Sequence, residues 1–169
     1  MNKDSLLQFF GKNFRGSMSS FVFRRAVFAD LEPIVHLLAD DDLGQQREKL
    51  ATPMNAAYKT AFDRILMDPN QFLMVVEAEG RIVGTCHLTL MPSLTFQGTL
   101  RMNVEAVRVD SASRGQGIGE WMFKKVIELG LVEGCGMIQL TTNKKRSDAL
   151  RFYEKLGFKA THEGMKLYL

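Results

Sequence analysis

Three glycines within five positions, Gly115, Gly117 and Gly119, constrain this chain more than any other feature of its sequence. They lie in the stretch SASRGQGIGEWMFKKVIELG, and a helical pattern follows them directly. Glycine costs about 0.5–1 kcal/mol relative to alanine inside regular structure, so the cluster indicates a tight turn or a close approach to the backbone. Amides at a helix N-terminus, with the helix dipole behind them, form an anion site. Both interpretations stay open here: a phosphate-binding loop, or a tight turn without a ligand.

Two common nucleotide-binding motifs do not fit these glycines. The dinucleotide fingerprint needs a third glycine where this chain has Glu120. A phosphate-binding P-loop needs Gly-Lys-Ser/Thr, and Trp121-Met122 stands in that place. What remains is a general anion site, with Arg114 adding positive charge at its mouth.

The order of expected elements predicts one α/β domain of α+β type over residues 21–169, after a flexible extension over residues 1–20. Hydrophobic patterns and turn residues predict strands at 21–28, 71–78, 81–91, 101–109, 137–142, 158–161 and 165–169. They predict helices at 31–40, with Asp30 as N-cap, and at 55–68, 118–133 and 147–156. We therefore expect a mixed, mostly antiparallel central sheet of six to seven strands, with helices on both faces.

Charge and cysteine content exclude several classes of protein. The net charge of +3 is too mild to indicate nucleic-acid binding by itself. Cys86 and Cys135 lie far apart and form no metal or redox spacing, which favours a reduced, cytoplasmic protein. No apolar run approaches the ~18 residues that a membrane span needs. We expect no metal, no nucleic acid and no membrane as partners.

Two motifs in register resemble the GNAT superfamily of acyl-CoA-dependent N-acyltransferases. RGQGIG at residues 114–119, after VEAVRVD, resembles the pyrophosphate loop of that family. DALRFYEKLGFK at residues 148–159 resembles its tyrosine-bearing helix and the strand that follows. The resemblance implies a GNAT-like fold, acetyl-CoA as cosubstrate, and direct transfer of the acetyl group to a primary amine in a ternary complex. A homodimer is the default expectation for the assembly.

The resemblance also implies which residues bind coenzyme A. Backbone groups of Val107 and Val109 are expected to pair with the pantetheine arm. The pyrophosphate is assigned to the glycine loop, that is, to Arg114, Gly115, Gln116, Gly117, Ile118 and Gly119. Asn143 lies where the family contacts the cofactor arm. Arg146 replaces an asparagine that is usual in the family; with Lys144 and Lys145 it either reaches the cofactor's phosphates or forms a solvated basic turn.

Tyr153 is the candidate general acid. Attack of an amine on a thioester expels a thiolate, whose conjugate acid has a pKa near 8.5 in the case of cysteine. A phenol with a pKa near 10 can donate a proton to that thiolate as it departs, and the resemblance implies this role for Tyr153. The alternative is a core residue, because Leu150, Tyr153 and Leu156 recur at helical spacing.

Glu105 is the candidate general base. It lies within an expected strand, and strict alternation places it on one face with Asn103, Val107 and Val109. Amine acceptors arrive as ammonium ions and must lose a proton, which a carboxylate can accept directly or through water. The alternative is a structural ion pair with a neighbouring arginine, namely Arg81, Arg101 or Arg108.

The remaining titratable residues carry weaker signals. His36, His87 and His162 each stand alone, which is more typical of structural histidines. The acidic segment 40–42, with Glu48, either lies in solvent or attracts a cationic amine. Two other classes of function stay open, a non-catalytic acyl-CoA-binding regulatory module and a nucleic-acid- or protein-binding domain on the same architecture.

Overall fold

The computed structural model describes residues 21–169, and the predicted extension over residues 1–20 lies outside the described residues. One sheet has the strand order β1-β2-β3-β4-β5. The strands are β1 (Val22–Arg25), β2 (Gln71–Ala78), β3 (Arg81–Met91), β4 (Arg101–Val109) and β5 (Met137–Leu140). Neighbouring strands are antiparallel except for β4 and β5, which are parallel. The prediction of a mixed, mostly antiparallel sheet is confirmed.

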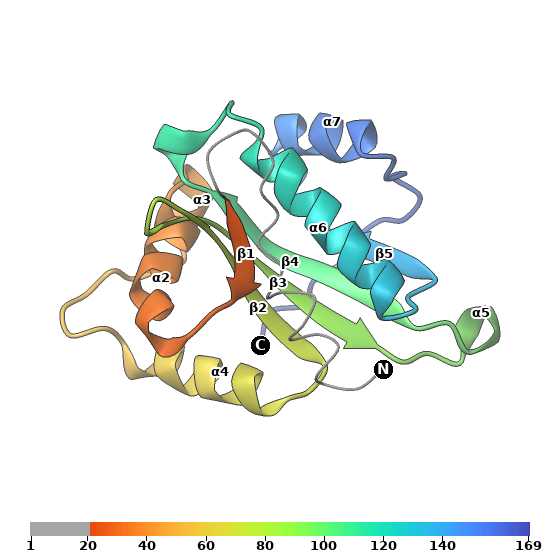
Figure 1. Ribbon diagram of the computed structural model, residues 1–169, viewed down its shortest axis with the longest axis horizontal. Helices are drawn as coiled ribbons and strands as arrows, with labels where there is room; N and C mark the ends of the chain where they lie inside the picture. The colour runs from red at the N-terminus through yellow and green to blue at the C-terminus, as the bar shows by residue number, and fades with distance from the viewer. Residues whose placement is uncertain (1–20) are drawn as a thin grey trace.

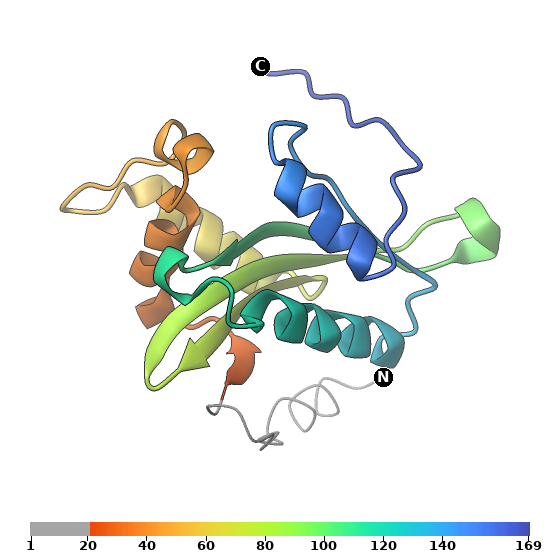
Figure 2. The same ribbon diagram turned by 90° about the horizontal axis from the view of Figure 1, so that it is seen from above.

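Helices cover both faces of this sheet. On one face lie α2 (Leu31–Ala39) and α4 (Ala56–Met67), and on the other lies α6 (Ile118–Val132), as Figures 1 and 2 show. The remaining helical segments are η1 (Phe28–Asp30), α3 (Asp42–Gln45), α5 (Thr95–Gly98), η2 (Ser111–Ser113) and α7 (Ser147–Lys155). Within residues 21–169, no helix is both long and apolar enough to cross a lipid bilayer.

Alternation along β2 explains why the sheet has two covered faces. Met74 and Val76 are fully buried in the core that includes α6, whereas Val75 is fully buried in the core beneath α2 and α4. Successive strand side chains point to opposite faces, so an unbroken apolar run requires cover on both. The turn at Glu79-Gly80 has positive φ at both residues, 50° and 75°, which suits a tight hairpin.

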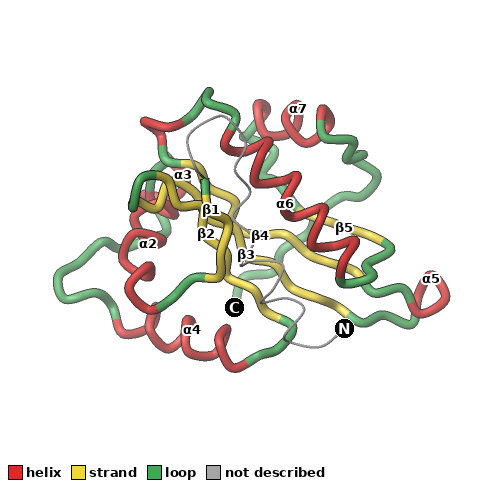
Figure 3. Tube along the Cα trace, viewed as in Figure 1, coloured by secondary structure: helices red, strands yellow, loops and turns green. Residues whose placement is uncertain are grey.

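The prediction of six to seven strands is wrong, because the sheet has five. The predicted strands at 158–161 and 165–169 pair with no neighbour, and the chain after α7 runs as irregular structure (Figure 3). Their alternating pattern suits a strand, but a strand forms only where a sheet edge satisfies its backbone groups. The apolar residues Met165, Leu167 and Tyr168 of this segment are accordingly exposed.

Two local predictions near the N-terminal helices also need correction. Asp30 is the N-cap residue of α2 as expected, but its side chain makes no capping bond to α2: the carboxylate accepts from the Val27 amide at 2.8 Å and from Arg24. Between the predicted helices at 31–40 and 55–68, where no element was predicted, the chain forms α3. Asp41 is the N-cap of α3, because its carboxylate accepts from the Gly44 amide at 2.6 Å.

Candidate active site

The glycine loop joins β4 to α6 and leaves the N-terminus of α6 uncapped. Gly117 is the N-cap, with φ of 78°, and as a glycine it offers no side-chain acceptor to the first amides of the helix. Gly115 also has φ of 78°, and a Cβ atom at either glycine would meet nothing within 4 Å. Both positions therefore need glycine for backbone conformation, while the space beside them is open. A 15-residue helix presents its free amides and the positive end of its dipole here.

Gly119 has a different role from the two turn glycines. A Cβ atom there would lie 3.4 Å from Cζ of Phe152 and 3.8 Å from Cγ2 of Val109. The absent side chain therefore lets the first turn of α6 pack closely against α7 and β4. The sequence motif combines two glycines that shape the loop with one that allows close packing.

The second half of β4 is paired on one side only. β4 pairs with β5 from Arg101 to Val104, whereas its pairing with β3 continues to Val109. The Asp110 amide donates to the Val83 carbonyl, so by alternation the backbone groups of Val107 and Val109 point away from β3. Their carbonyls accept from arginine side chains, Val107 from Arg108 at 2.7 Å and Val109 from Arg114 at 3.0 Å.

A bulge at Ala106 separates the two halves of β4. Ala106 has φ of 51°, and the β3–β4 register shifts between Thr85 and His87. The inserted residue reverses the alternation, so Val107 packs on the core of the α6 side while Glu105 is exposed. The prediction that Glu105 and Val107 share one face is therefore wrong. Bulges of this kind are common next to active sites, where they redirect side chains.

His87 lies directly opposite Glu105 in the β3–β4 ladder. Its Nε2 atom is buried and has no hydrogen-bond partner among the described residues. Burial lowers the pKa of His87, and the charge of Glu105 offsets part of this effect. Among the described residues no ion pair joins Glu105 to Arg81, Arg101 or Arg108, and Arg108 pairs with Asp41; the role of Glu105 stays a prediction.

Tyr153 lies on α7, and its ring is buried in a cluster of aromatic side chains. Its centroid lies 5.3 Å from that of Phe123, 5.2 Å from that of Phe152 and 5.9 Å from that of Phe158. Within residues 21–169 the Tyr153 hydroxyl makes no hydrogen bond. Burial raises the pKa of Tyr153, while Arg108 and Arg146 lower it in part. The phenol is therefore protonated at neutral pH and can act as a proton donor.

The acidic segment after α2 connects parts of the site that are distant in sequence. The Asp40 carboxylate accepts from the Ser111 amide at 2.7 Å, and Arg114 donates to the Asp40 carbonyl at 3.0 Å. Asp41 pairs with Arg146 at 2.6 Å and lies 3.7 Å from Nε of Arg108. The segment thus holds the glycine loop and the start of α7 in place. This role differs from both predicted alternatives, a solvated segment and a site that attracts a cationic amine.

In the basic turn before α7, the lysine and arginine side chains point in different directions. Exposed Lys144 pairs with exposed Glu163 at 2.7 Å, whereas Arg146 points inward to Asp41. The Asn143 side chain accepts from the Lys145 amide at 2.9 Å and so shapes the turn. Contacts of Asn143 and Arg146 with the cofactor stay predictions.

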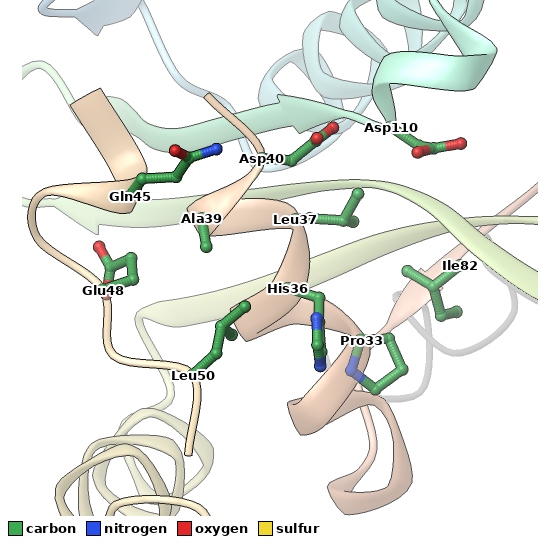
Figure 4. Close-up of a pocket in the computed structure, with 10 residues that line it drawn as sticks. All are labelled: Pro33, His36, Leu37, Ala39, Asp40, Gln45, Glu48, Leu50, Ile82 and Asp110. Carbon is green, nitrogen blue, oxygen red and sulfur yellow. The ribbon is translucent and has the colours of Figure 1, made fainter. Parts of the chain in front are cut away.

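A cavity of about 660 Å³ lies beside the glycine loop (Figure 4). It opens between α2, the segment 45–50, the start of β3 and Asp110. Its polar lining includes the carboxylates of Asp40, Glu48 and Asp110, above apolar Pro33, Leu37 and Ile82. Neither Glu105 nor Tyr153 lines this cavity, so it is separate from the two candidate catalytic side chains.

Comparisons with known proteins agree with this geometry. A Trypanosoma brucei brucei protein named glucosamine 6-phosphate N-acetyltransferase is 38% identical over 90 residues, which are 53% of this chain and 59% of that protein. An aminoalkylphosphonate N-acetyltransferase of Salmonella typhimurium is 30% identical over 63% of this chain and 68% of that protein. A crystal structure of a Bacillus halodurans C-125 protein described as a transcriptional regulator is 48% identical, with a TM-score of 0.86, and the match covers 88% of this chain and 99% of that one.

The sequence model of a single family spans the parts of the chain described above. It matches residues 32–158, which contain all but the first residue of α2, the bulge of β4, the glycine loop and Tyr153. This range is most of the described chain, and the GNAT resemblance is confirmed. The chain belongs to the Acetyltransferase (GNAT) family.

Proposed function

We propose that this protein is an N-acetyltransferase that moves the acetyl group of acetyl-CoA directly to a primary amine. The family implies acetyl-CoA as the acetyl donor. One observation carries the proposal: after the one-sided stretch 105–109 of β4, η2 and the glycine loop bring the chain to the N-terminus of α6. Backbone groups that point away from β3, beside an anion site, match a ligand that has an amide-bearing arm and a pyrophosphate.

The residues of the loop and strand fit coenzyme A in the following way. The amides of residues 116–119 would hold the pyrophosphate, with Gly115 shaping the loop and Arg114 supplying positive charge. Backbone groups of Val107 and Val109 would pair with the pantetheine arm once their arginine partners move aside. The bound thioester would supply an acetyl group that is open to attack from the face of β4 that carries Glu105.

Two side chains would move the protons of the reaction. Glu105 is exposed on the stretch 105–109 of β4 that pairs on one side only, which we call the open half of β4. Its carboxylate takes a proton from the incoming ammonium and so frees the nitrogen lone pair. The nitrogen attacks the acetyl carbon, the carbon–sulfur bond breaks, and the electron pair leaves on sulfur. The Tyr153 hydroxyl then donates its proton to that sulfur, and the resulting phenolate takes back the second proton that the nitrogen releases as the amide forms. This route needs neither a covalent enzyme intermediate nor a metal.

The names of two relatives support a small primary amine as acceptor. One relative is named for glucosamine 6-phosphate and the other for aminoalkylphosphonates. We also propose a cytoplasmic location, which the unpaired Cys86 and Cys135 support. Assembly as a homodimer stays a prediction.

A thiol-release assay with acetyl-CoA and a panel of primary amines tests this function. Coenzyme A alone should raise the melting temperature, because it binds only the folded chain. Gly117→Val should abolish that shift. Gly134→Val is the matched control, because Gly134 lies beyond the other end of α6 with φ of 73° and equally open surroundings.

Each outcome of these assays has a distinct meaning. Thiol release with at least one amine supports the enzyme. A thermal shift with coenzyme A but no thiol release with any amine supports the non-catalytic acyl-CoA-binding module instead. No thermal shift at millimolar coenzyme A contradicts both functions.

A further inference from the structure

Three charged side chains from separate parts of the chain meet one another outside the paired half of β4. Arg108 comes from the open half of β4, Arg146 from the start of α7, and Asp41 from the corner between α2 and α3. Asp41 lies 2.6 Å from Arg146 and 3.7 Å from Nε of Arg108. We call these three residues the arginine cluster. Arg108 and Arg146 both lower the pKa of Tyr153 in part, against the effect of its burial.

Positive charge in the arginine cluster exceeds negative charge. Asp41 is one carboxylate between two guanidinium groups, and Arg47 adds further positive charge near Arg108. The Arg108 side chain is only 11% exposed, and its Nε atom is buried without a hydrogen-bond partner among the described residues. Burying a cation without full compensation is costly, so an anion bound here would be stabilised.

The face of the sheet indicates which molecule can supply that anion. Val107 and Val109 pack on the α6 side, so by alternation Arg108 points to the opposite face, which also carries Glu105. The phosphates of coenzyme A are assigned to the N-terminus of α6, and its pantetheine arm is uncharged. An anion at Arg108 and Arg146 would therefore belong to the acceptor.

The spacing along β4 limits the size of the acceptor. Glu105 and Arg108 are three residues apart, at most about 10 Å at ~3.3 Å per residue, and the bulge shortens this distance. An acceptor that reaches both side chains has its amine and its anionic group only a few bonds apart. Two guanidinium groups suit a phospho group, whose oxygens accept several charge-assisted hydrogen bonds.

We infer that the acceptor is a small primary amine bearing a phosphate or phosphonate group, and that Arg108 and Arg146 bind this group in place of Asp41. This inference rests on the proposed acetyltransferase function and names the residues that select its substrate. Asp41 holds the two arginines in position until the acceptor's anion replaces its carboxylate between them. The amine then lies over the open half of β4, near Glu105.

Kinetics with matched acceptors test the inference. We would compare glucosamine 6-phosphate with glucosamine, and 2-aminoethylphosphonate with propylamine, in the wild-type chain and in Arg146→Gln. Arg146 is at the surface end of the cluster, with 28% of its side chain exposed, so its replacement should not prevent folding. We expect kcat/KM to fall by about 10- to 100-fold for the phospho amines and by less than about 3-fold for the other two.

Two further variants sharpen the kinetic result. Arg146→Lys keeps the charge but loses the planar fork, so its kcat/KM for the phospho amines should lie between those of the wild type and Arg146→Gln. Arg151→Gln removes an exposed arginine of the same helix, which pairs with Asp148, and should change kcat/KM for neither class of acceptor. A fall of equal size for all four amines in Arg146→Gln would overturn the inference. A matching rise in the KM for acetyl-CoA would also overturn it, because Arg146 would then serve the cofactor.

A binding measurement separates this inference from the proposed function. 2-Aminoethylphosphonate alone should raise the melting temperature of the wild-type chain and of Arg151→Gln, but not that of Arg146→Gln. If this pattern holds while no amine is acetylated, the anion site stands and the enzymatic function fails. If amines are acetylated while 2-aminoethylphosphonate gives no Arg146-dependent shift, the function stands and the anion site fails.

Discussion

The two halves of β4 differ in what surrounds them. From Arg101 to Val104 the strand has partners on both sides, and Met102 and Val104 are buried to 0% and 1% exposure. From Glu105 to Val109 it has a partner on one side, begins with a bulge, and carries exposed Glu105. Residues that stabilise the core and residues assigned to the proposed chemistry are thus neighbours on one strand. Local strain, such as the positive φ of Ala106, is tolerated in the second half because the first half holds the strand in the sheet.

Tyr153→Phe should give the largest effect, and it tests whether the open half of β4 works with α7 in catalysis. Phe keeps the ring contacts, and the hydroxyl makes no hydrogen bond with any described residue, so the free energy of unfolding should change little. Turnover should fall by about 10²–10⁴-fold, or about 3–5 kcal/mol at 1.36 kcal/mol per decade. Steady-state kinetics should place this loss in kcat instead of KM. Normal turnover would return Tyr153 to a purely structural role.

Met102→Ala tests the opposite half of the strand. A fully buried methionine replaced by alanine leaves a cavity and should cost about 2–5 kcal/mol in the free energy of unfolding. Val107→Ala, at a half-buried position of the open half, should cost clearly less. Urea unfolding of both variants measures the contrast. Equal losses would mean that the open half contributes as much to stability as the paired half.

Glu105→Gln tests whether the exposed carboxylate of the open half is the base. Turnover should fall by about 10²-fold at neutral pH and by less at high pH, where more of the amine is already uncharged. The pH profile of kcat/KM for one acceptor measures this change. A profile of unchanged shape that is only scaled down would indicate that Glu105 positions the substrate.

His87→Gln should give the smallest effect. The substitution should change how the free energy of unfolding depends on pH below neutral. The pKa of His87 is lowered below its ordinary value of 6.5 by burial, so between the two values the unfolded chain binds a proton that the folded chain does not. The contribution of His87 to stability is therefore present above pH 6.5 and is lost as the pH falls through the lowered value. Urea unfolding between pH 7 and 5 should show a smaller loss in His87→Gln than in the wild type. Identical slopes would contradict this origin.

Local chemistry explains which parts of the fold could be predicted from the sequence. The Glu79-Gly80 hairpin follows from turn residues between alternating strands, and α6 follows from periodicity after the glycine loop. The segment 158–169 has the same alternation as a strand, but a pattern does not reveal whether a sheet edge is available to pair with it. Turn residues therefore predicted the hairpin of β2 and β3 correctly, whereas alternation alone predicted two strands within 158–169 that do not form.

The candidate site was less predictable, because its contacts are long-range. The glycine loop and Tyr153 belong to local motifs, but the bulge at Ala106 inserts one residue without a sequence signal and reverses the face of Val107. The pairing of His87 with Glu105 depends on the register that this bulge sets. The meeting of Asp41 with Arg146 depends on the placement of α2 and α7, which no short pattern encodes.

The brace between Asp40 and Arg114 has a consequence for how the chain folds. These residues are 74 positions apart, and the contact closes a loop that contains most of the sheet. The entropy of closing so long a loop is lost before the contact returns any energy, so high-separation contacts of this kind form late on the folding pathway. We expect the hairpin of β2 and β3 to form early and the glycine loop to reach its native position last. A nascent chain would thus acquire its sheet before it can bind coenzyme A.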